Sequence, residues 1–467
     1  METLSNPITN LLNLQTLKLN NCGRLRKLPR HFEKLVNLRH LELKWCNRLT
    51  HMPNGLGMLT NLQTLSKFVL CKSSDSVPRH GGELKELMEL NNLGGVLEVS
   101  NLRHGKEAGV ESESANLKEK QHLRSLSLAW DSSVDNTDAT EAILGYEMSL
   151  EGLQPHPNLE SLSLEYYGGM MFSSWLSSLT NLVNLSLYSC KKCQHLPPLN
   201  QFHRLERLQL SVLPCLEYVL SEEDFFSSLT SETKILSSLR ELWLVNLPNL
   251  KGWWRDESGE VENFFATTTT TSTQSSEENR RLLPSFTSLT YLLVDNCPKL
   301  TCMPLYPHLE ERLILKNTSM KPFQQTIESS NNGLLQIPTA SSFSPLSKLT
   351  TLEIYKNEDL ECLPDWFKSL TSLKRLWIRD CSKLKDLRPG IQHLSSLREL
   401  DIENCKGLEE MFLNDDAIMW KALNERLHTL RLDWFHKLEA LPQGIQHLTS
   451  LTQLDVIALV LPIYMIN

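Results

Sequence analysis

The amino-acid sequence predicts an α/β repeat solenoid, a fold in which short units stack along one axis. The first observation is a phrase, Leu-x-x-Leu-x-Leu, that returns at a spacing of 23 or 24 residues within each run of repeats. It begins at Leu14, Leu38, Leu159, Leu182, Leu205, Leu349, Leu373, Leu397, Leu427 and Leu451. The second is that a leucine pattern with a period of about 20–29 residues is typical of leucine-rich repeats. Such a chain presents a long surface rather than a cleft, so we expect a binding protein.

Each unit should begin with a short strand. In the first full unit, Leu17, Lys18 and Leu19 alternate between apolar and polar, which is the period of a half-buried strand. No single unit can bury its apolar face, so neighbouring units must stack to form the core. We therefore expect one leucine-rich-repeat domain over residues 1–467, a horseshoe of roughly 15 units with a parallel sheet on its concave side.

The convex side should be irregular, with short helices. A Leu-Pro or Met-Pro pair recurs at Leu28-Pro29, Met52-Pro53, Leu196-Pro197, Met303-Pro304, Leu363-Pro364 and Leu441-Pro442. Proline has a fixed φ and no N–H to donate, so it suits an irregular outer segment and would damage a central strand. Short helical turns are expected after these pairs, as at 32–35 and 366–370.

Three segments interrupt the repeats, and their polar composition predicts disordered insertions. Residues 131–149 are polar and acidic, residues 255–284 include five consecutive threonines, and residues 328–345 are rich in serine and asparagine.

The repeat phrase that ends at Leu313-Ile-Leu315 contains one extra residue, which predicts a bulge or an irregular strand. Both ends look truncated, because neither carries the polar cap that a solenoid needs for solubility.

The composition indicates which kinds of partner are not expected. The net charge is −8 and both signs are mixed along the chain, so we expect no nucleic-acid partner. No apolar run reaches the roughly 18–20 residues that a membrane span requires, and no signal peptide opens the chain, so we expect no membrane span.

Six of the 11 cysteines occupy one repeat position, three residues after the second aliphatic residue of the strand: Cys22, Cys46, Cys190, Cys297, Cys381 and Cys405. We interpret them as small residues buried at the strand exit. Reduced thiols favour the cytoplasm or the nucleus. Cys190-Lys-Lys-Cys193 has the form of a metal or redox pair, but no second pair lies at ligand spacing, so we expect no metal site.

Several longer phrases are more specific than the bare repeat. They are Gly-Gly-Glu-Leu-Lys-Glu-Leu at 81–87, Asn-Asn-Leu-Gly-Gly-Val-Leu-Glu-Val-Ser-Asn-Leu at 91–102, Leu-Glu-Gly-Leu-Gln-Pro-His-Pro-Asn-Leu at 150–159, Leu-Pro-Asn-Leu-Lys-Gly-Trp-Trp at 247–254, and Gly-Ile-Gln-His-Leu at 390–394 and 444–448. These phrases resemble the leucine-rich-repeat region of plant intracellular immune receptors. That family is the coiled-coil class of nucleotide-binding, leucine-rich-repeat (NB-ARC-LRR) disease resistance proteins.

The resemblance implies a function in plant defence. It implies a sensor region that recognises a pathogen effector or a guarded host protein, and that contacts the nucleotide-binding domain of the parent receptor to help hold it inactive. No Gly-x-x-x-x-Gly-Lys-[Ser/Thr] phosphate loop occurs in this chain, so we expect no nucleotide and no other cofactor.

The outward strand positions carry many large aromatic residues, and Trp and Tyr are enriched at binding hot spots. With two neighbouring arginines, the predicted partner-binding residues of the concave face are Trp45, Trp130, Tyr166, Tyr188, Trp243, Tyr291, Tyr355, Trp377, Arg379, Arg431 and Trp434. Other charges between them include Glu42, Glu353, Arg375, Asp401 and Asp433. The alternative is that adjacent aromatic side chains only cover one another on the sheet.

The sequence also bears on two other classes of function, an enzyme and a general adaptor. An enzyme is disfavoured because the chain has no Gly-x-Ser-x-Gly, no His-Glu-x-x-His and no paired Cys-x-x-Cys motif. A general protein–protein adaptor, such as the substrate-binding arm of a ubiquitin ligase, is the alternative to an immune sensor. An F-box ahead of the repeats would favour the adaptor, and a phosphate loop there would favour the sensor.

Overall fold

The computed structural model describes residues 2–72, 82–132, 140–220, 236–254, 285–331, 344–413, 417–435 and 441–457. The chain divides into two compact units, Met1–Leu216 and Glu217–Asn467, and each is described by itself. A single continuous domain stays a prediction.

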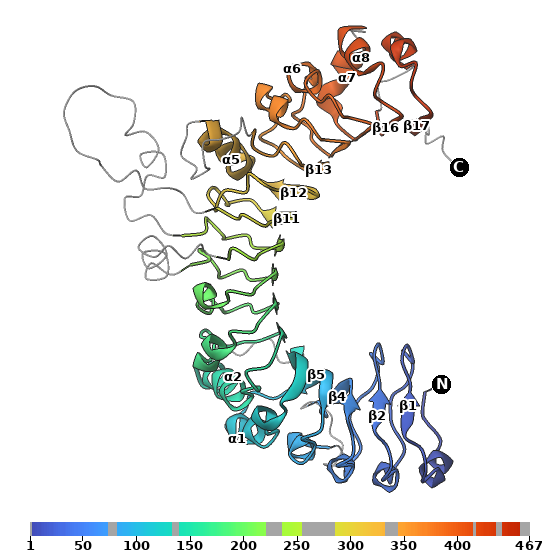
Figure 1. Ribbon diagram of the computed structural model, residues 1–467, viewed down its shortest axis with the longest axis vertical. Helices are drawn as coiled ribbons and strands as arrows, with labels where there is room; N and C mark the ends of the chain where they lie inside the picture. The colour runs from blue at the N-terminus through green and yellow to red at the C-terminus, as the bar shows by residue number, and fades with distance from the viewer. Residues whose placement is uncertain are drawn as a thin grey trace, which may run out of the picture. The chain divides into compact units, whose positions relative to one another are not determined.

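The strands of the first unit are parallel and form two runs, each of them hydrogen-bonded in chain order (Figure 1). One sheet contains β1 (Thr16–Lys18), β2 (His40–Glu42) and β3 (Thr64–Leu65). A second run contains β4 (Lys67–Val69), β5 (Gly94–Leu102), β6 (His122–Trp130), β7 (Ser161–Glu165), β8 (Asn184–Tyr188) and β9 (Arg207–Ser211). Between β3 and β4 the Ser66 hydroxyl accepts a hydrogen bond from the Leu43 amide at 2.7 Å, so a side chain replaces a ladder bond there.

The second unit repeats the same arrangement. Its strands are β10 (Glu241–Val245), β11 (Tyr291–Cys297), β12 (Arg312–Thr318), β13 (Thr351–Tyr355), β14 (Arg375–Arg379), β15 (Glu399–Glu403), β16 (Thr429–Asp433) and β17 (Gln453–Ile457). All neighbouring pairs are parallel, and each joins residues of the same repeat position.

This register stacks the inward side chains into columns. Leu352, Leu376, Leu400 and Leu430 are partners on successive strands, and each is fully buried. Burying one such side chain contributes about 1.5–3 kcal/mol, so each column makes a large contribution to the stability of the unit. Parallel strands and stacked aliphatic columns confirm the predicted α/β leucine-rich-repeat solenoid.

Short helices lie on the side opposite the strands. The 3-10 helices are η1 (Asn6–Asn10), η2 (Phe32–Lys34), η3 (Leu56–Met58), η4 (Leu84–Leu87), η5 (Leu117–Glu119), η7 (Ser174–Ser178), η8 (Leu199–Gln201), η9 (Asp365–Ser369), η10 (Lys406–Leu408) and η11 (Gln443–His447). The α-helices are α1 (Ala108–Glu113), α2 (Thr140–Gly152), α5 (Lys321–Asn331), α6 (Arg388–Ile391), α7 (Glu409–Leu413) and α8 (Ala417–Leu423). The predicted short helical turns after the proline pairs are confirmed at η2 and η9. Among the described helices, none is long and apolar enough to cross a bilayer.

The strand exits share a tight turn. A residue with a left-handed backbone follows most strands, and it is often asparagine or aspartate, as at Asn246, Asp380 and Asn404. These residue types adopt positive φ at the lowest cost after glycine. The cysteine that follows is buried, and its thiol donates to a carbonyl of the neighbouring strand in the previous repeat, as from Cys405 to Ile378 at 3.6 Å. The predicted burial holds at this repeat position except at Cys22, which is half-exposed.

Two predicted insertions are partly helical. Residues 140–149 belong to α2, so the prediction of disorder was wrong there, because Tyr146, Ser149 and Leu150 are buried. Residues 328–331 belong to α5, although this segment was also predicted to be disordered, because the apolar Phe323 and Ile327 earlier in α5 are buried and anchor the helix. Residues 133–139, 255–284 and 332–343 lie outside the described residues.

The bulge expected near Leu313 is absent. β12 pairs with β11 and β13 in continuous register, since the extra residue is taken up before the strand begins. Register shifts occur instead between β5 and β6, at Gly95/Val96 and Ser100/Leu102.

Helix α2 packs closely against the chain at 104–113. A Cβ atom on Gly145 would lie 1.8 Å from the His104 carbonyl oxygen, and one on Gly152 would lie 2.6 Å from the Gly109 carbonyl oxygen. Between them, the Ser149 and Ser112 hydroxyls are 3.1 Å apart. These small residues let the helix approach the neighbouring backbone.

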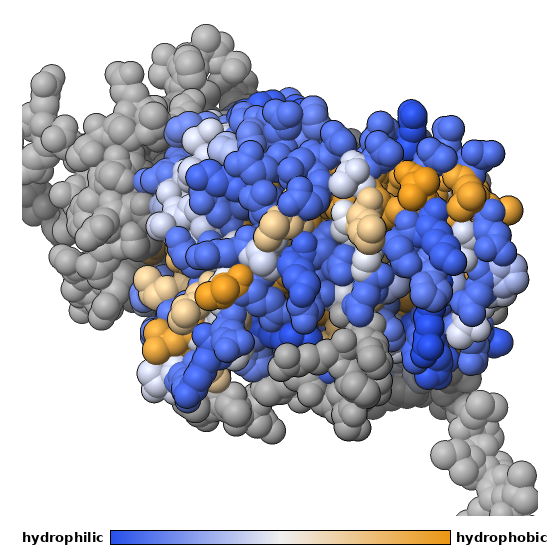
Figure 2. All heavy atoms as spheres, turned by 90° about the horizontal axis from the view of Figure 1, so that it is seen from below, coloured by the Kyte–Doolittle hydropathy of each residue, from blue (hydrophilic) through white to orange (hydrophobic). Residues whose placement is uncertain are grey.

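Figure 2 shows one face of the molecule, which is largely hydrophilic with a few apolar patches.

We expect Gly145→Ala to destabilise the first unit, because the new methyl group has no room beside the His104 carbonyl. The loss should be about 2 kcal/mol in the free energy of unfolding, measured by denaturant titration. Gly105→Ala is the matched control, since a Cβ there meets nothing within 4 Å. Equal stability of the two variants would contradict this packing.

The first unit also buries a lysine. Lys120 follows η5 and is fully buried, and its ammonium group donates to the Leu87 carbonyl oxygen at 2.7 Å. Burial lowers the pKa of Lys120 from 10.5 to about 8. Below that pH the charged form is held away from water, which costs the folded state free energy.

The sign of the pH dependence follows from this lowered pKa. Between about pH 8 and 10.5 the unfolded chain binds the proton and the folded chain does not, so stability should rise with pH. The full gain is about 3 kcal/mol. We expect Lys120→Met to unfold at higher denaturant concentration than the wild type at pH 7, and the difference to shrink by pH 10.5. A difference that does not vary with pH would refute the assignment.

Candidate functional site

Outward side chains of the second unit form aligned rows. The central outward positions of successive strands are Glu353, Trp377, Asp401, Arg431 and Asp455, which the ladder places side by side. The row beside it, at the strand ends, contains Tyr355, Arg379, Glu403 and Asp433. The central row begins at Trp243 of β10, and we call the outward side chains of β10–β17 the charged sheet face.

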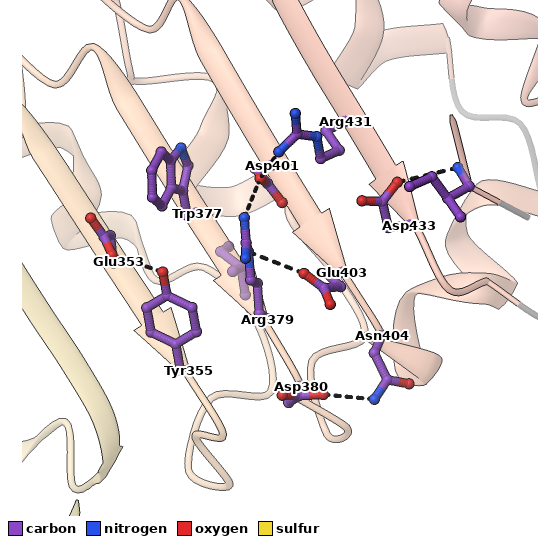
Figure 3. Close-up of polar contacts among 12 residues, drawn as sticks. Glu353, Tyr355, Trp377, Arg379, Asp380, Asp401, Glu403, Asn404, Arg431 and Asp433 are labelled. Carbon is purple, nitrogen blue, oxygen red and sulfur yellow. Dashed lines mark hydrogen bonds and ion pairs between the residues drawn. The ribbon is translucent and has the colours of Figure 1, made fainter. Parts of the chain in front are cut away.

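Asp401 lies at the centre of this face and is only 2% exposed. Its Oδ2 atom accepts hydrogen bonds from Arg379 at 2.6 Å and from Arg431 at 3.4 Å (Figure 3). Arg379 also lies 3.3 Å from Glu403, and Arg431 donates to Asp455 at 3.0 Å. The two arginines are therefore held by three carboxylates on two strands, β15 and β17, and each keeps a fixed direction on the sheet.

Aromatic rings are part of the same network. The Arg379 guanidinium lies 5.5 Å from the centre of the Trp377 ring and 5.9 Å from that of Tyr355, within range of a cation–π interaction. The Trp377 indole donates to Glu399 at 2.9 Å.

Glu353 joins Tyr355 to the neighbouring strand. It is 2% exposed and accepts from the Tyr355 hydroxyl at 2.7 Å and from Arg312 at 2.6 Å. Burial and the Glu353 carboxylate raise the pKa of Tyr355, so its hydroxyl stays a donor.

The predicted residues fall into three groups. The first group lies on strands as expected. Trp243, Trp377 and Arg431 occupy strand centres, and Tyr188, Tyr291, Tyr355 and Arg379 occupy strand ends. In this group the Trp243 and Tyr291 rings are 5.8 Å apart, so these two side chains cover one another in part.

The second group lies in the turns after the strands. Trp45, Tyr166 and Trp434 have positive φ and stand beyond the ends of β2, β7 and β16. Their side chains are 69%, 37% and 41% exposed, respectively. The left-handed turn, which the leucine pattern alone does not locate, takes these residues out of the strand rows.

The prediction that Trp130 lies on the outward face was wrong, because this residue lies in the core. It ends β6 with 2% exposure, its indole donates to the Ser149 hydroxyl at 3.2 Å, and its ring lies 5.0 Å from that of Tyr167. Helix α2 provides the pocket that buries it. Trp130 is a core residue and is not part of a binding face.

The first unit presents smaller outward side chains. Ser127, Ser163 and Ser186 are partners at the centres of β6, β7 and β8. Large side chains that could anchor a partner are thus denser in the second unit. Arg312, Glu399, Glu403 and Asp455 were not among the predicted site residues, although their repeat positions would have identified them once the register was known.

The arrangement is suited to recognition of a surface. It combines aromatic rings with directed hydrogen-bond donors and acceptors. Within the described residues, no group of three or more His, Cys, Asp or Glu side chains is placed to hold a metal ion. Fold and face together define a leucine-rich-repeat solenoid with an ordered, polar and aromatic sheet surface.

Comparison with known proteins shows to which group of leucine-rich-repeat proteins the chain belongs. A model of the R13L1/DRL21 leucine-rich repeats matches residues 84–213 and 308–405, and a model of the leucine-rich repeats of plant disease resistance protein RPS2-like sequences matches residues 362–458. The chain belongs to the leucine-rich-repeat regions of plant disease resistance proteins.

Individual relatives carry the same description. The chain is 33% identical over 300 residues to the putative disease resistance protein RGA4 of Solanum bulbocastanum, covering 63% of this chain and 25% of that protein. It is 30% identical over 314 residues to the putative disease resistance RPP13-like protein 1 of Arabidopsis thaliana, covering 65% of this chain and 29% of that protein. The chain thus spans little more than a quarter of the length of these relatives.

We expect Asp401→Asn to destabilise the second unit by about 2 kcal/mol, because Arg379 and Arg431 lose the charge that they share. The control is Glu310→Gln, which removes an exposed ion pair with Lys348 and should cost less than about 0.5 kcal/mol. Denaturant unfolding of both variants checks the difference, and equal losses would contradict a central role for Asp401.

Proposed function

We propose that this chain is the recognition region of an intracellular plant immune receptor. In this proposal the charged sheet face binds a pathogen effector or a host protein that the receptor guards. The family membership supports the defence role, and the network around Asp401 is the observation that supports the surface. The proposal requires no catalysis and no cofactor.

The physical argument is preorganisation. Trp377 and Arg379 are residue types that dominate binding hot spots. Both are already held in one conformation, by Glu399 and by Asp401 respectively. A partner that docks on them does not have to order these long side chains, so less binding free energy is lost to conformational entropy.

We further propose a contact with the nucleotide-binding domain of the parent receptor, which would help to keep the receptor inactive. The support is the resemblance to that receptor class and the disease resistance names of the relatives. The same names favour an immune sensor over a general adaptor.

Trp243→Ala and Trp377→Ala test the proposed surface. In the receptor that carries this region, each should weaken recognition of the matching pathogen by about tenfold or more, because a hot-spot tryptophan is removed. The readout is the defence response of leaf tissue, with receptor abundance measured beside it.

Trp366→Ala is the matched control for this test. Trp366 lies in η9, on the side opposite the strands, and should leave recognition intact. Full recognition by the two sheet variants at normal abundance would contradict the proposal.

A further inference from the structure

Helix α2 leaves an apolar stripe uncovered. Its small residues, Gly145, Ser149 and Gly152, face the neighbouring backbone. On another side, Leu144 and Met148 lie one helical turn apart and are 52% and 49% exposed. A surface helix normally carries polar side chains at such positions.

Two neighbouring segments extend this stripe. Val110 of α1 is 72% exposed and directly follows Gly109, whose ideal Cβ position lies 3.3 Å from the Cβ atom of Met148. After β7, Met170 and Met171 are 37% and 57% exposed. We call Val110, Leu144, Met148, Met170 and Met171 the methionine patch.

The backbone under the patch is well held. The Glu147 carboxylate accepts hydrogen bonds from the Met170 and Met171 amides at 3.1 and 3.0 Å. The Tyr167 hydroxyl donates to the Met171 carbonyl oxygen at 2.6 Å. A fixed backbone therefore displays flexible, polarizable side chains, which is the combination found on surfaces that bind apolar helices.

The two helices that form the centre of the patch, with the segment before α1, carry mostly negative charge. Residues 103–113 and 140–152 contain six glutamates and two basic residues. Both basic residues are already paired, Arg103 with Glu111 at 3.1 Å and Lys106 with Glu141 at 2.9 Å. The remaining glutamates are Glu107, Glu113, Glu147 and Glu151. An apolar stripe within a negative field complements an apolar stripe flanked by positive charge.

We propose that the methionine patch binds an amphipathic helix of a partner protein, one whose leucine-rich stripe is flanked by lysine or arginine. This surface lies on α1, α2 and the segment after β7. The inference is therefore independent of the proposed role of the charged sheet face.

A synthetic helical peptide with leucine on one face and lysine on the others is a direct probe. Its binding to the full chain can be followed by fluorescence anisotropy of the labelled peptide. Leu144→Gln combined with Met148→Gln should weaken binding by about tenfold or more, because the centre of the patch becomes polar. Glu107→Gln combined with Glu113→Gln should weaken it by about threefold and reduce its salt dependence.

Val36→Gln is the matched control, since Val36 is an apolar residue with 53% exposure elsewhere in the first unit. It should bind the peptide like the wild type, and circular dichroism should show that all variants fold. Equal binding by the control and the patch variant would overturn the proposal. So would equal binding of a peptide with glutamate in place of lysine, or self-association of the chain through this patch in sedimentation.

Discussion

The fold depends on the in-register stacking of aliphatic side chains between parallel strands. Each of β13–β16 places two such side chains inward, and the ladder sets them directly against their counterparts in the next repeat. The columns that result form the part of the core that lies directly under the sheet. The left-handed residue at the strand exit supports this arrangement, because it turns the chain away from the sheet and toward the opposite side before the next repeat begins.

Much of this fold could be predicted from the sequence, because the spacing of the leucines specifies both the position of each strand and its register with the next strand. The positions of Trp377 and Arg431 followed directly, as did the helical turns after the proline pairs. The turns that follow the strands were harder to predict from the sequence. Trp45 and Trp434 stand where an extended strand would place an outward side chain, but a left-handed backbone takes them into the turn. That conformation is unusual for tryptophan, so nothing in the residue type indicated it.

The errors at Trp130 and α2 have a common cause. The segment before α2 is acidic and polar, which favoured a loop over residues 131–149. The helix that forms at its end is held by close backbone approach at Gly145 and by burial of Tyr146 and Leu150. Once α2 is present, Trp130 has an apolar environment and a hydrogen-bond acceptor in Ser149. Single-sequence patterns do not contain tertiary contacts of this kind, so one missed helix also reversed the assignment of a tryptophan.

The charged sheet face differs from an ordinary polar surface in how its charges are arranged. Glu353 and Asp401 are almost fully buried beneath the arginines that they bind, and they act on the surface by orienting those arginines. Removing such a carboxylate alters the geometry of its neighbours as well as the local charge. The outward rows are thus a connected set, in contrast to the small serine side chains of the first unit.

The residue added before Leu313 has a wider meaning for how such chains diversify. The strand that follows keeps its pairing with both neighbours, so the extra length is confined to the linker between units. A gene that gains or loses a codon in such a linker alters the loop and leaves the sheet geometry unchanged. Outward codons can likewise change while the inward columns remain. The architecture thereby separates heritable variation of the outward surface from the requirement to fold.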